Sequence, residues 1–557
     1  MTDKIAIETR CLSSLSKVFP DGEPAPAERC GSGSALRGEH YSFQIAYRAP
    51  ELTRTAKVRV KVAAPGLEGR ISVKSVGLAP SALPCYGDPD DDILRGVPGL
   101  YPDPLHPLGP GDTVKVPPRQ WRSLWIEAAI GRDARPGAHA IEVSFVSETG
   151  EALGHEVFAL EVIPAELPEQ ELIHTEWLHA DCLATEYGVD IFSDRHWALI
   201  EAYVGTAAAH GMNMLLTPLF TPPLDTAVGG ERPTVQLVDV RLDGDTYSFG
   251  FDKLNRWIEM GLRKGIRYFE FSHLFTQWGA KHAPKIEALA EGVPIKLFGW
   301  HTDAAGEPYR RFLDAFLPEL VDYIRVRGLE SRVYFHVSDE PHEADVESYR
   351  AAADIMRKHL SGFPIIDALS DFAFYELGLV GQPIPANDRI EPFLAAGVPE
   401  LWTYYCCSQY KDVANRFFDM PSARSRILGL QLYKYRIKGF LHWGYNFWYA
   451  QYSERPIRPF EVTDAGGAFP SGDAFLVYPG SEGDGPIESI RLKVVREALQ
   501  DQRALQLLER LAGRETAAAL IESELDAPLT FAAYPREGAW LLRRRERINQ
   551  AIRDAVR

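Results

Sequence analysis

The chain has 557 residues, of which 45% are hydrophobic and 25% charged, with 60 Lys+Arg against 77 Asp+Glu and a formal net charge of −17 at pH 7. This composition is typical of a globular protein and excludes a disordered, collagen-like or coiled-coil chain. The length allows two to four domains, or one large barrel with an appendage, and the acidic balance argues against nucleic-acid binding, which needs clustered Lys and Arg.

The N-terminal residues, MTDKIAIETRCLSSLSK, contain no apolar stretch typical of a secretory signal peptide. The sequence has no run of about 18 apolar residues, which a membrane span needs. We therefore expect a cytoplasmic protein with neither a membrane partner nor a nucleic-acid partner. The cysteines are too few and too scattered for a disulfide framework, and none forms a CxxC pair; they are Cys11, Cys30, Cys85, Cys182, Cys406 and Cys407.

Residues 1–168 predict an all-β accessory domain. Short stretches of alternating apolar and polar residues are separated by turn-forming clusters, which is the pattern of a β-sandwich. The domain ends in the proline-containing segment 155–168. We expect this domain to support the rest of the chain or to take part in a homo-oligomer interface. The alternating stretches are AKVRVKVAA (56–64), RISVKSVGL (70–78), DTVKVPP (112–118) and HAIEVSFVS (139–147).

Residues 169–500 predict a (β/α)8 barrel of the TIM type, and residues 501–557 a helical tail packed on it. One helix is expected to begin after Ser193 and to end at Gly211, and another to span about 252–264 and to end at Gly265. A doubly wound sheet is the alternative, disfavoured because no strand precedes a glycine-rich phosphate loop. The eight strand candidates are 173–178, 212–217, 267–275, 333–340, 363–369, 379–384, 400–407 and 439–447.

Polar and aromatic residues follow these strand candidates. Because the active site of a barrel lies at the carboxyl ends of its strands, we expect them to line one mouth. Trp278 and Trp443 offer flat faces on which a sugar ring can stack. The candidate substrate-binding residues are Glu176, His179, Asp181, His273, Gln277, Trp278, His336, Asp367, Tyr404, Tyr405, Trp443, Tyr445 and Asn446.

The adjacent carboxylates Asp339 and Glu340 follow an apolar strand and precede a proline. Neighbouring carboxylates can divide their roles, one ionised and the other holding a proton, which suits glycoside cleavage. Side chains i and i+1 of a strand point to opposite sides, so this pair is a poor nucleophile-plus-acid couple. It suits a reaction in which a 2-acetamido group of the substrate is the nucleophile. The blander alternative is that Asp339 caps a helix and Glu340 is solvated.

Several motifs resemble the proteins that carry the domain of unknown function 4091, among them glycoside hydrolase family 123, the β-N-acetylgalactosaminidases. The resemblance covers roughly residues 170–500, and the Asp-Glu pair is its most specific motif. The motifs are TEWLHADCLA (175–184), LLTPLFTPPLDT (215–226), FTQWGA (275–280), FHVSDEPH (335–342), YYCC (404–407), NRFF (415–418) and GFLHWGYNFW (439–448).

This resemblance implies an exo-acting, retaining enzyme that removes terminal β-linked N-acetylgalactosamine from a glycan through an oxazolinium intermediate, without a cofactor. It implies that Asp339 orients and stabilises the acetamido group and that Glu340 is the acid and base. A late-strand tyrosine, Tyr404 or Tyr405, would bind the acetamido carbonyl, as in the similar family 20 hexosaminidases.

Other interpretations remain open at this point. A conventional two-carboxylate glycosidase would take its nucleophile from another strand end, and a non-catalytic glycan-binding barrel would keep the pocket without the reaction. His179 with Asp181 and Cys182 could be metal ligands, but no metal site is predicted, because a third ligand at a recognisable spacing is missing and hydrogen bonds to substrate or core are favoured. Vicinal Cys406 and Cys407 are expected to pack beside the pocket, with a redox role as the alternative. The other candidate nucleophiles are Glu176, Glu270, Asp367 and Asp371. Three arginines could bind an anionic sugar or lie on a helix face and pair with acids: Arg416, Arg424 and Arg426.

Overall fold

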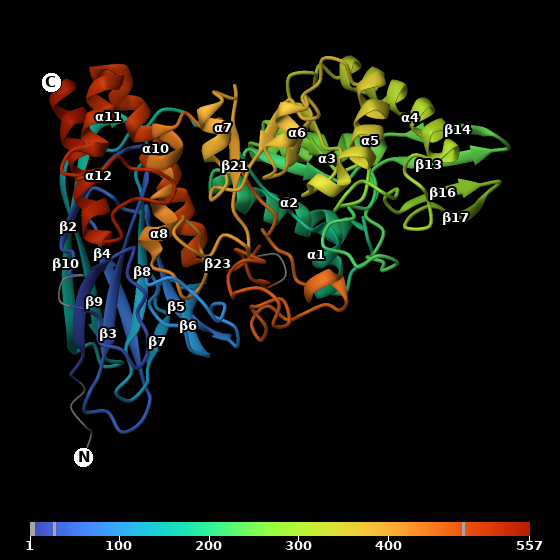
Figure 1. Cartoon of the computed structure of the whole chain (residues 1–557). Coiled ribbons are helices and arrows are strands. Elements are labelled where there is room, and N and C mark those ends of the chain that lie inside the picture. Colours follow the sequence, from blue (N-terminus) through green and yellow to red (C-terminus); the bar gives the residue numbers. More distant parts are fainter. Residues whose placement is uncertain (1–5, 26–28, 482–484, 557) are drawn as a thin grey trace.

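The computed structural model describes residues 6–25, 29–481 and 485–556. The N-terminal strands and the C-terminal helices lie side by side at one end of the molecule, and the segment between them extends away from both (Figure 1). Among the described residues, no helix is both long and apolar enough to cross a membrane.

Two β-sheets form the N-terminal part, which confirms the predicted β-rich region. Phe43 of one sheet stacks on Phe158 of the other, with ring centroids 4.2 Å apart, inside a shared apolar core. The first sheet has the order β1 (Glu8–Ser13), β3 (His40–Arg48), β8 (Arg122–Ala129), β5 (Ile71–Ser81), β6 (Gly99–Pro107) and β23 (Glu488–Ser489). The second has the order β2 (Ser32–Arg37), β10 (Ala152–Glu166), β9 (Gly137–Val146), β4 (Ala56–Ala63) and β7 (Thr113–Val116).

A parallel sheet organises the middle of the chain. Its strand order is β18 (Val333–Phe335), β15 (Tyr268–Phe271), β12 (Met214–Thr217), β11 (Ile173–Glu176), β22 (Gly439–His442) and β21 (Trp402–Tyr404). The first strand, β11, therefore pairs with both the second and the last strand of this region. Two further strands, β19 (Ile366–Ala368) and β20 (Gln382–Ile384), form a small parallel sheet of their own.

All eight predicted strands are present, but the predicted (β/α)8 barrel is confirmed only in part. The described strands pair regularly as two parallel sheets rather than as one ring. Single parallel bridges, Phe335 to Ile365 and Ala386 to Tyr404, connect the small sheet to the two edges of the larger one. Pro364 and Pro385 beside these strands, and Pro383 within β20, lack the N–H groups that a longer ladder would need.

Helices follow most of these strands, and two of them have the predicted ends. The Ser193 hydroxyl caps α2 by accepting a hydrogen bond from the His196 N–H, and Gly265 ends α3 with φ of 98°. The helices of this region are α1 (Ala180–Tyr187), α2 (Asp194–Ala209), α3 (Asp252–Lys264), α4 (Glu307–Val326), α5 (Val346–His359), α6 (Ala373–Glu376), α7 (Glu391–Ala395), α8 (Ser422–Arg426) and α9 (Leu428–Lys434).

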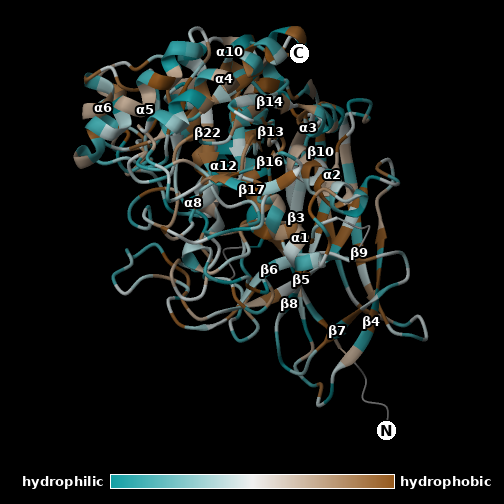
Figure 2. Cartoon of the chain, turned by 90° about the vertical axis from the view of Figure 1, so that its right-hand side faces the viewer, coloured by the Kyte–Doolittle hydropathy of each residue, from teal (hydrophilic) through white to brown (hydrophobic). Residues whose placement is uncertain are grey.

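A four-stranded sheet, which the sequence patterns did not predict, projects from this part of the chain (Figure 1). Its antiparallel hairpins enter after β12 and after β15, and it packs on α4 through Phe312 and Phe316. Its order is β14 (Thr246–Gly250), β13 (Asp239–Asp243), β16 (Ile286–Ala290) and β17 (Val293–Phe298). Hydrophilic and hydrophobic residues mix along the outer helices, as expected for helices with one buried face (Figure 2).

The C-terminal helices are α10 (Ile490–Ala512), α11 (Arg514–Glu522) and α12 (Gly538–Ala555). The helix α10 packs against α8 and α9 of the middle region and against α12, and α12 packs on β2 and β10 of the N-terminal part. Helix α10 runs through residue 500, where the sequence pattern placed a boundary. The division at 168 and 500 stays a prediction.

Candidate active site

A pocket of about 760 Å³, its open mouth included, lies at the carboxyl ends of the parallel strands. Residues that end or follow seven strands, β11, β12, β15, β18, β19, β21 and β22, form its wall. Six of the predicted residues line it: Gln277, Trp278, Asp339, Glu340, Tyr404 and Trp443. The other lining residues are Trp177, Leu224, Asp225, Ala368, Cys406, Cys407, Leu441, Gln451, Tyr452 and Phe469.

The backbone of the Asp339–Glu340 pair is held between two neighbouring strand ends. The Trp278 N–H donates to the Asp339 carbonyl (2.9 Å), and the Glu340 N–H donates to the Ala368 carbonyl (2.9 Å). Glu340 has φ of 44°, in the left-handed region that a non-glycine residue seldom adopts. Because Glu340 leaves the extended conformation, the alternation of side chains expected for a regular strand does not hold, and both side chains line the pocket.

Tyr404 contacts the dyad directly. Its hydroxyl donates to Glu340 Oε1 at 2.7 Å, and burial together with the nearby Glu340 raises the pKa of Tyr404 well above its usual value. Tyr405 lies outside the pocket, with its ring against Phe440 and His442 and its buried hydroxyl without a described hydrogen-bond partner. Of the two tyrosines that the sequence left open, the structure places Tyr404 in the pocket.

Asp339 has a higher pKa than an ordinary surface carboxylate. Burial and the adjacent Glu340 raise its pKa well above the usual value, and His336 acts in the opposite direction. The dyad therefore retains a proton at higher pH than two isolated carboxylates would.

A third carboxylate, Asp225, lies on another side of the pocket, and the sequence analysis did not single it out. Tyr452 N–H donates to its Oδ2 (3.0 Å), and its own N–H donates to Gln277 Oε1 (2.6 Å). Burial raises the pKa of Asp225 to about 6. Asp225, Trp278 and Tyr452 all have positive φ, with values of 39°, 56° and 58°. The only sequence signal for Asp225 was its place in the segment LLTPLFTPPLDT.

The aromatic residues of the pocket are held in fixed orientations. Trp443 donates its indole N–H to Asp473 Oδ2 (3.0 Å), and Trp177 donates its indole N–H to Glu270 Oε1 (2.8 Å). Trp278 and Tyr452 are both more than a third exposed and meet edge to face, with centroids 5.8 Å apart. They form an apolar edge suited to stacking on a sugar.

Glu176, predicted to bind substrate, is instead part of a buried ion pair. Arg416 donates to both of its oxygens (2.7 and 2.9 Å) and also contacts His442 Nδ1. The candidate anion-binding arginines are likewise paired with acids, Arg424 with Asp90 and Arg426 with Asp501 and Glu497.

His179, Asp181, Asn446 and Tyr445, also predicted to bind substrate, hold the fold beside the pocket. Asp181 receives two hydrogen bonds from Arg232 (2.6 and 2.8 Å), and His179 contacts Arg232 and the Trp443 carbonyl. Burial and the Arg232 charge lower the pKa of His179 to about 3. The metal-ligand alternative for His179 and Asp181 is not supported, because an arginine occupies their donor atoms. Asn446 bonds the backbone of His179, and the Tyr445 hydroxyl donates to the Tyr203 carbonyl.

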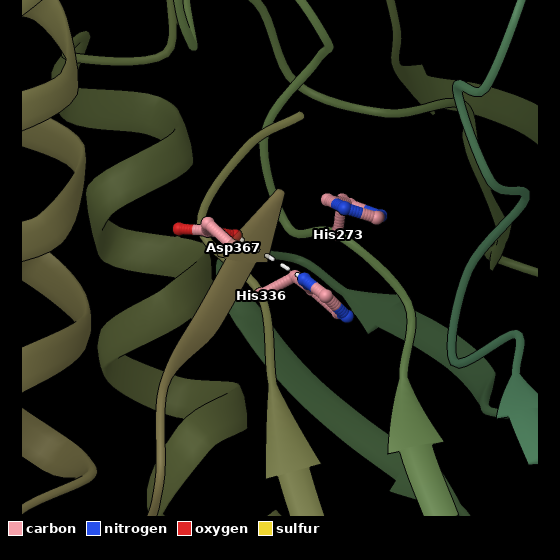
Figure 3. Close-up of side chains that lie close together, drawn as sticks. All are labelled: His273, His336 and Asp367. Carbon is pink, nitrogen blue, oxygen red and sulfur yellow. Dashed lines mark hydrogen bonds and ion pairs between the residues drawn. The ribbon is translucent and has the colours of Figure 1, made fainter. Parts of the chain in front are cut away.

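His273, His336 and Asp367 lie close together at the ends of neighbouring strands (Figure 3), and all three are buried and absent from the pocket lining. One donor atom from each lies within 4.8 Å of the others, a spacing that would admit a metal ion. The two imidazole rings, however, are stacked at 4.2 Å and 26°, so their in-plane nitrogen lone pairs do not converge. Both His336 nitrogens already contact carboxylates: Nε2 lies 2.7 Å from Glu270 and Nδ1 3.2 Å from Asp367. The arrangement fits a charged His336 hydrogen-bonded to two acids better than a metal centre.

The vicinal cysteines line the pocket, as the packing interpretation predicted. Cys406 is buried, and Gln409 Oε1 accepts hydrogen bonds from both its N–H and its thiol. A loop of the N-terminal part contacts the segment that follows the two cysteines: Asp88 pairs with Lys411, and the Tyr86 ring meets the Tyr410 ring edge to face. The redox alternative has no further support from these contacts.

Comparison with known proteins adds the following findings. The family model described as "Glycoside hydrolase 123, catalytic domain" matches residues 177–508. A family 123 glycoside hydrolase from Clostridium perfringens, whose structural analysis concerns glycolipid glycan hydrolysis, superimposes with a TM-score of 0.74 at 15% identity, covering 99% of this chain and 98% of that one. A β-glucuronidase from Parabacteroides merdae covers 90% of this chain and 52% of that one at 10% identity, with a TM-score of only 0.31. No curated protein matches the sequence.

Proposed function

The chain belongs to glycoside hydrolase family 123, and from this premise we propose that it is an exo-acting, retaining β-N-acetylgalactosaminidase that works by substrate assistance. The observation that carries the proposal is the pocket's set of catalytic groups: Asp339 and Glu340 side by side, with the Tyr404 hydroxyl on Glu340. Their roles follow from what each atom can donate or accept.

In the proposed first step, the 2-acetamido oxygen of the bound sugar attacks the anomeric carbon, and the glycosidic C–O bond breaks. Asp339 accepts the acetamido N–H and stabilises the positive charge that develops on the oxazolinium ring. Glu340 gives its proton to the leaving oxygen and then removes a proton from the water that opens the ring. The acetamido oxygen attacks the face opposite the leaving group, and the water attacks the face that the leaving group has vacated, so two successive inversions retain the anomeric configuration.

The proton needed by Glu340 is available from the dyad itself. Tyr404 donates to Glu340, and burial and the Glu340 charge favour the protonated form of Asp339. A substrate N–H directed at Asp339 would favour its carboxylate form, which releases the proton that the pair retains. Tyr404 is thereby free to donate to the acetamido carbonyl.

The substrate class that we propose is a glycan with a terminal β-linked N-acetylgalactosamine, with the glycan of a glycolipid as one candidate. The exposed pair of Trp278 and Tyr452 would stack on the terminal sugar, the one that the enzyme releases. Seven strand ends from both parallel sheets surround the pocket, and we propose that the two sheets act as one ring of eight strands around it.

Asp225 favours a second candidate function, a two-carboxylate glycosidase on a sugar without an acetamido group. Three carboxylates line the described pocket, and Asp225 is the one outside the dyad. Its carboxylate accepts from the Tyr452 N–H, and its backbone bonds Gln277 and Ser453.

A panel of aryl β-glycosides tests the proposal. We expect hydrolysis of the N-acetylgalactosaminide at least about 100-fold faster, in kcat/KM, than that of the galactoside, because galactose lacks the internal nucleophile. The N-acetylglucosaminide reports separately on recognition of the 4-hydroxyl. Equal rates for the galactoside and the N-acetylgalactosaminide, together with loss of both in Asp225→Asn, would favour the second candidate function.

A further inference from the structure

A buried histidine, His336, lies three residues before Asp339 at the end of β18, with no exposed side-chain surface. Each of its ring nitrogens faces a carboxylate oxygen from a neighbouring strand: Nε2 lies 2.7 Å from Glu270 and Nδ1 3.2 Å from Asp367. The other described partners of these two carboxylates all donate to them. Those donors are Thr175 Oγ1 and Trp177 Nε1 for Glu270, and Val337 N–H and the Tyr349 hydroxyl for Asp367.

This geometry favours a charged imidazole. Ionised carboxylates only accept, so with both acids ionised each His336 nitrogen carries a hydrogen, and a ring with both hydrogens is an imidazolium. Burial raises the pKa of Asp367, whereas the hydrogen bond and the charge of His336 act in the opposite direction. Burial acts against this charge, but the hydrogen bonds to Asp367 and Glu270 outweigh it and raise the pKa of His336 to about 9. The stacked neighbour His273 is the reverse case, since burial and the His336 charge lower its pKa well below the usual value.

Three acids and one cation act on the pKa of Asp339. Glu340 on the same segment, Asp367 from β19 and Glu270 from β15 are acids, and each raises the pKa of Asp339. His336 is the single cation in this group, and it lowers that pKa. Without it, the two pocket acids Asp339 and Glu340 and the two buried acids Glu270 and Asp367 would lie together without this compensating charge.

We propose that His336 is a fixed buried cation that sets the pH at which the Asp339–Glu340 pair ionises, and that Glu270 and Asp367 keep it charged. The inference rests on the proposed function of that pair. His336 is a positioning residue in this account: it touches neither substrate nor the reacting atoms and acts through Asp339.

The kinetic test compares His336→Gln with His273→Gln, its uncharged neighbour in the same stack. Removing the cation makes ionisation of the dyad harder, so the acid limb of the kcat/KM–pH profile of His336→Gln should move up by about one pH unit or more. The loss of activity should therefore be large at pH 5 and much smaller at pH 8. His273→Gln should keep the acid limb of the wild-type enzyme. An equal loss for His336→Gln at every pH would show a structural role alone and overturn the inference.

A second measurement depends on neither folding of the variant nor activity. In protein labelled with ¹⁵N-histidine, two protonated ring nitrogens of one buried histidine should persist at pH 7.5 and disappear only near pH 9. A neutral His336 at pH 7.5 would overturn the inference even if the enzyme is active. If the wild-type enzyme hydrolyses no 2-acetamido glycoside, the proposed function fails, whereas this spectrum still decides the charge of His336.

Discussion

At the scale of single residues, the site depends on small departures from regular geometry. Glu340 turns out of the strand conformation at φ of 44°, and Asp225 and Trp278 adopt positive φ beside the same pocket. Non-glycine residues in this region are strained, and such strain is concentrated at functional sites. Hydrogen bonds from Trp278 to Asp339 and from Glu340 to Ala368 maintain it. The strained backbone brings the two adjacent carboxylates into one pocket.

The role of Glu340 makes a residue-scale prediction. Replacing Glu340 with Gln removes the proton donor but keeps the shape, so the loss should depend on how much help the leaving group needs. We expect kcat/KM for a disaccharide to fall by about 100-fold or more, and that for an aryl glycoside with a good leaving group by less than about tenfold. Steady-state rates with both substrates measure this ratio. Equal losses for the two substrates would remove Glu340 from the acid role.

At the scale of elements, the sequence was sufficient to locate the strands but not to determine their pairing. Apolar runs with polar ends identified all eight parallel strands, and the glycine and serine signals identified the ends of α2 and α3. The division into two sheets depends on three-residue strands flanked by prolines, which a periodic pattern does not resolve. The projecting four-stranded sheet was also missed, because its short strands lie within what looked like loops.

Residue type at a strand end did not reveal side-chain direction, which explains why several predicted site residues are absent from the pocket lining. Glu176, His336 and Asp367 lie at strand ends as predicted, yet their side chains are buried and bonded within the protein. A buried charge must find a partner, and the partner Arg416 is 240 residues away from Glu176 in sequence. The adjacent pair could be singled out from residue type and order, whereas the tyrosine came from the resemblance and was left open between Tyr404 and Tyr405.

At the scale of the whole molecule, buried ion pairs join parts far apart in sequence. Asp501 of α10 is fully buried and accepts from Arg426 of α8 (2.7 and 3.0 Å) and from Arg545 of α12 (2.9 Å). Arg545 also bonds Glu39, which lies between β2 and β3. This network links the N-terminal sheets, the middle region and the C-terminal helices. An apolar core with residues from all three parts joins them as well.

Replacing Asp501 with Ala tests that linkage. Two buried arginines would lose an acceptor, and we expect the free energy of unfolding to fall by about 3–5 kcal/mol. The matched control is Asp322→Ala, which removes an exposed partner of Arg325 at 3.8 Å and should cost less than about 1 kcal/mol. Urea denaturation followed by tryptophan fluorescence measures both. Similar midpoints for the two variants would contradict a linking role for Asp501.

The central claim is that Asp339 stabilises an intermediate formed by the substrate's own acetamido group. The direct measurement is inhibition by the thiazoline analogue of N-acetylgalactosamine, which mimics the bicyclic intermediate, with wild-type enzyme, Asp339→Ala and the control Asp371→Ala. Asp371 lies outside the pocket and accepts from the Ala373 N–H, so its variant should be inhibited like the wild type. We predict that the thiazoline inhibits the wild type at least about 100-fold more tightly than Asp339→Ala, because a mimic of the intermediate responds to the lost charge. Equal inhibition of the wild type and Asp339→Ala would contradict the account.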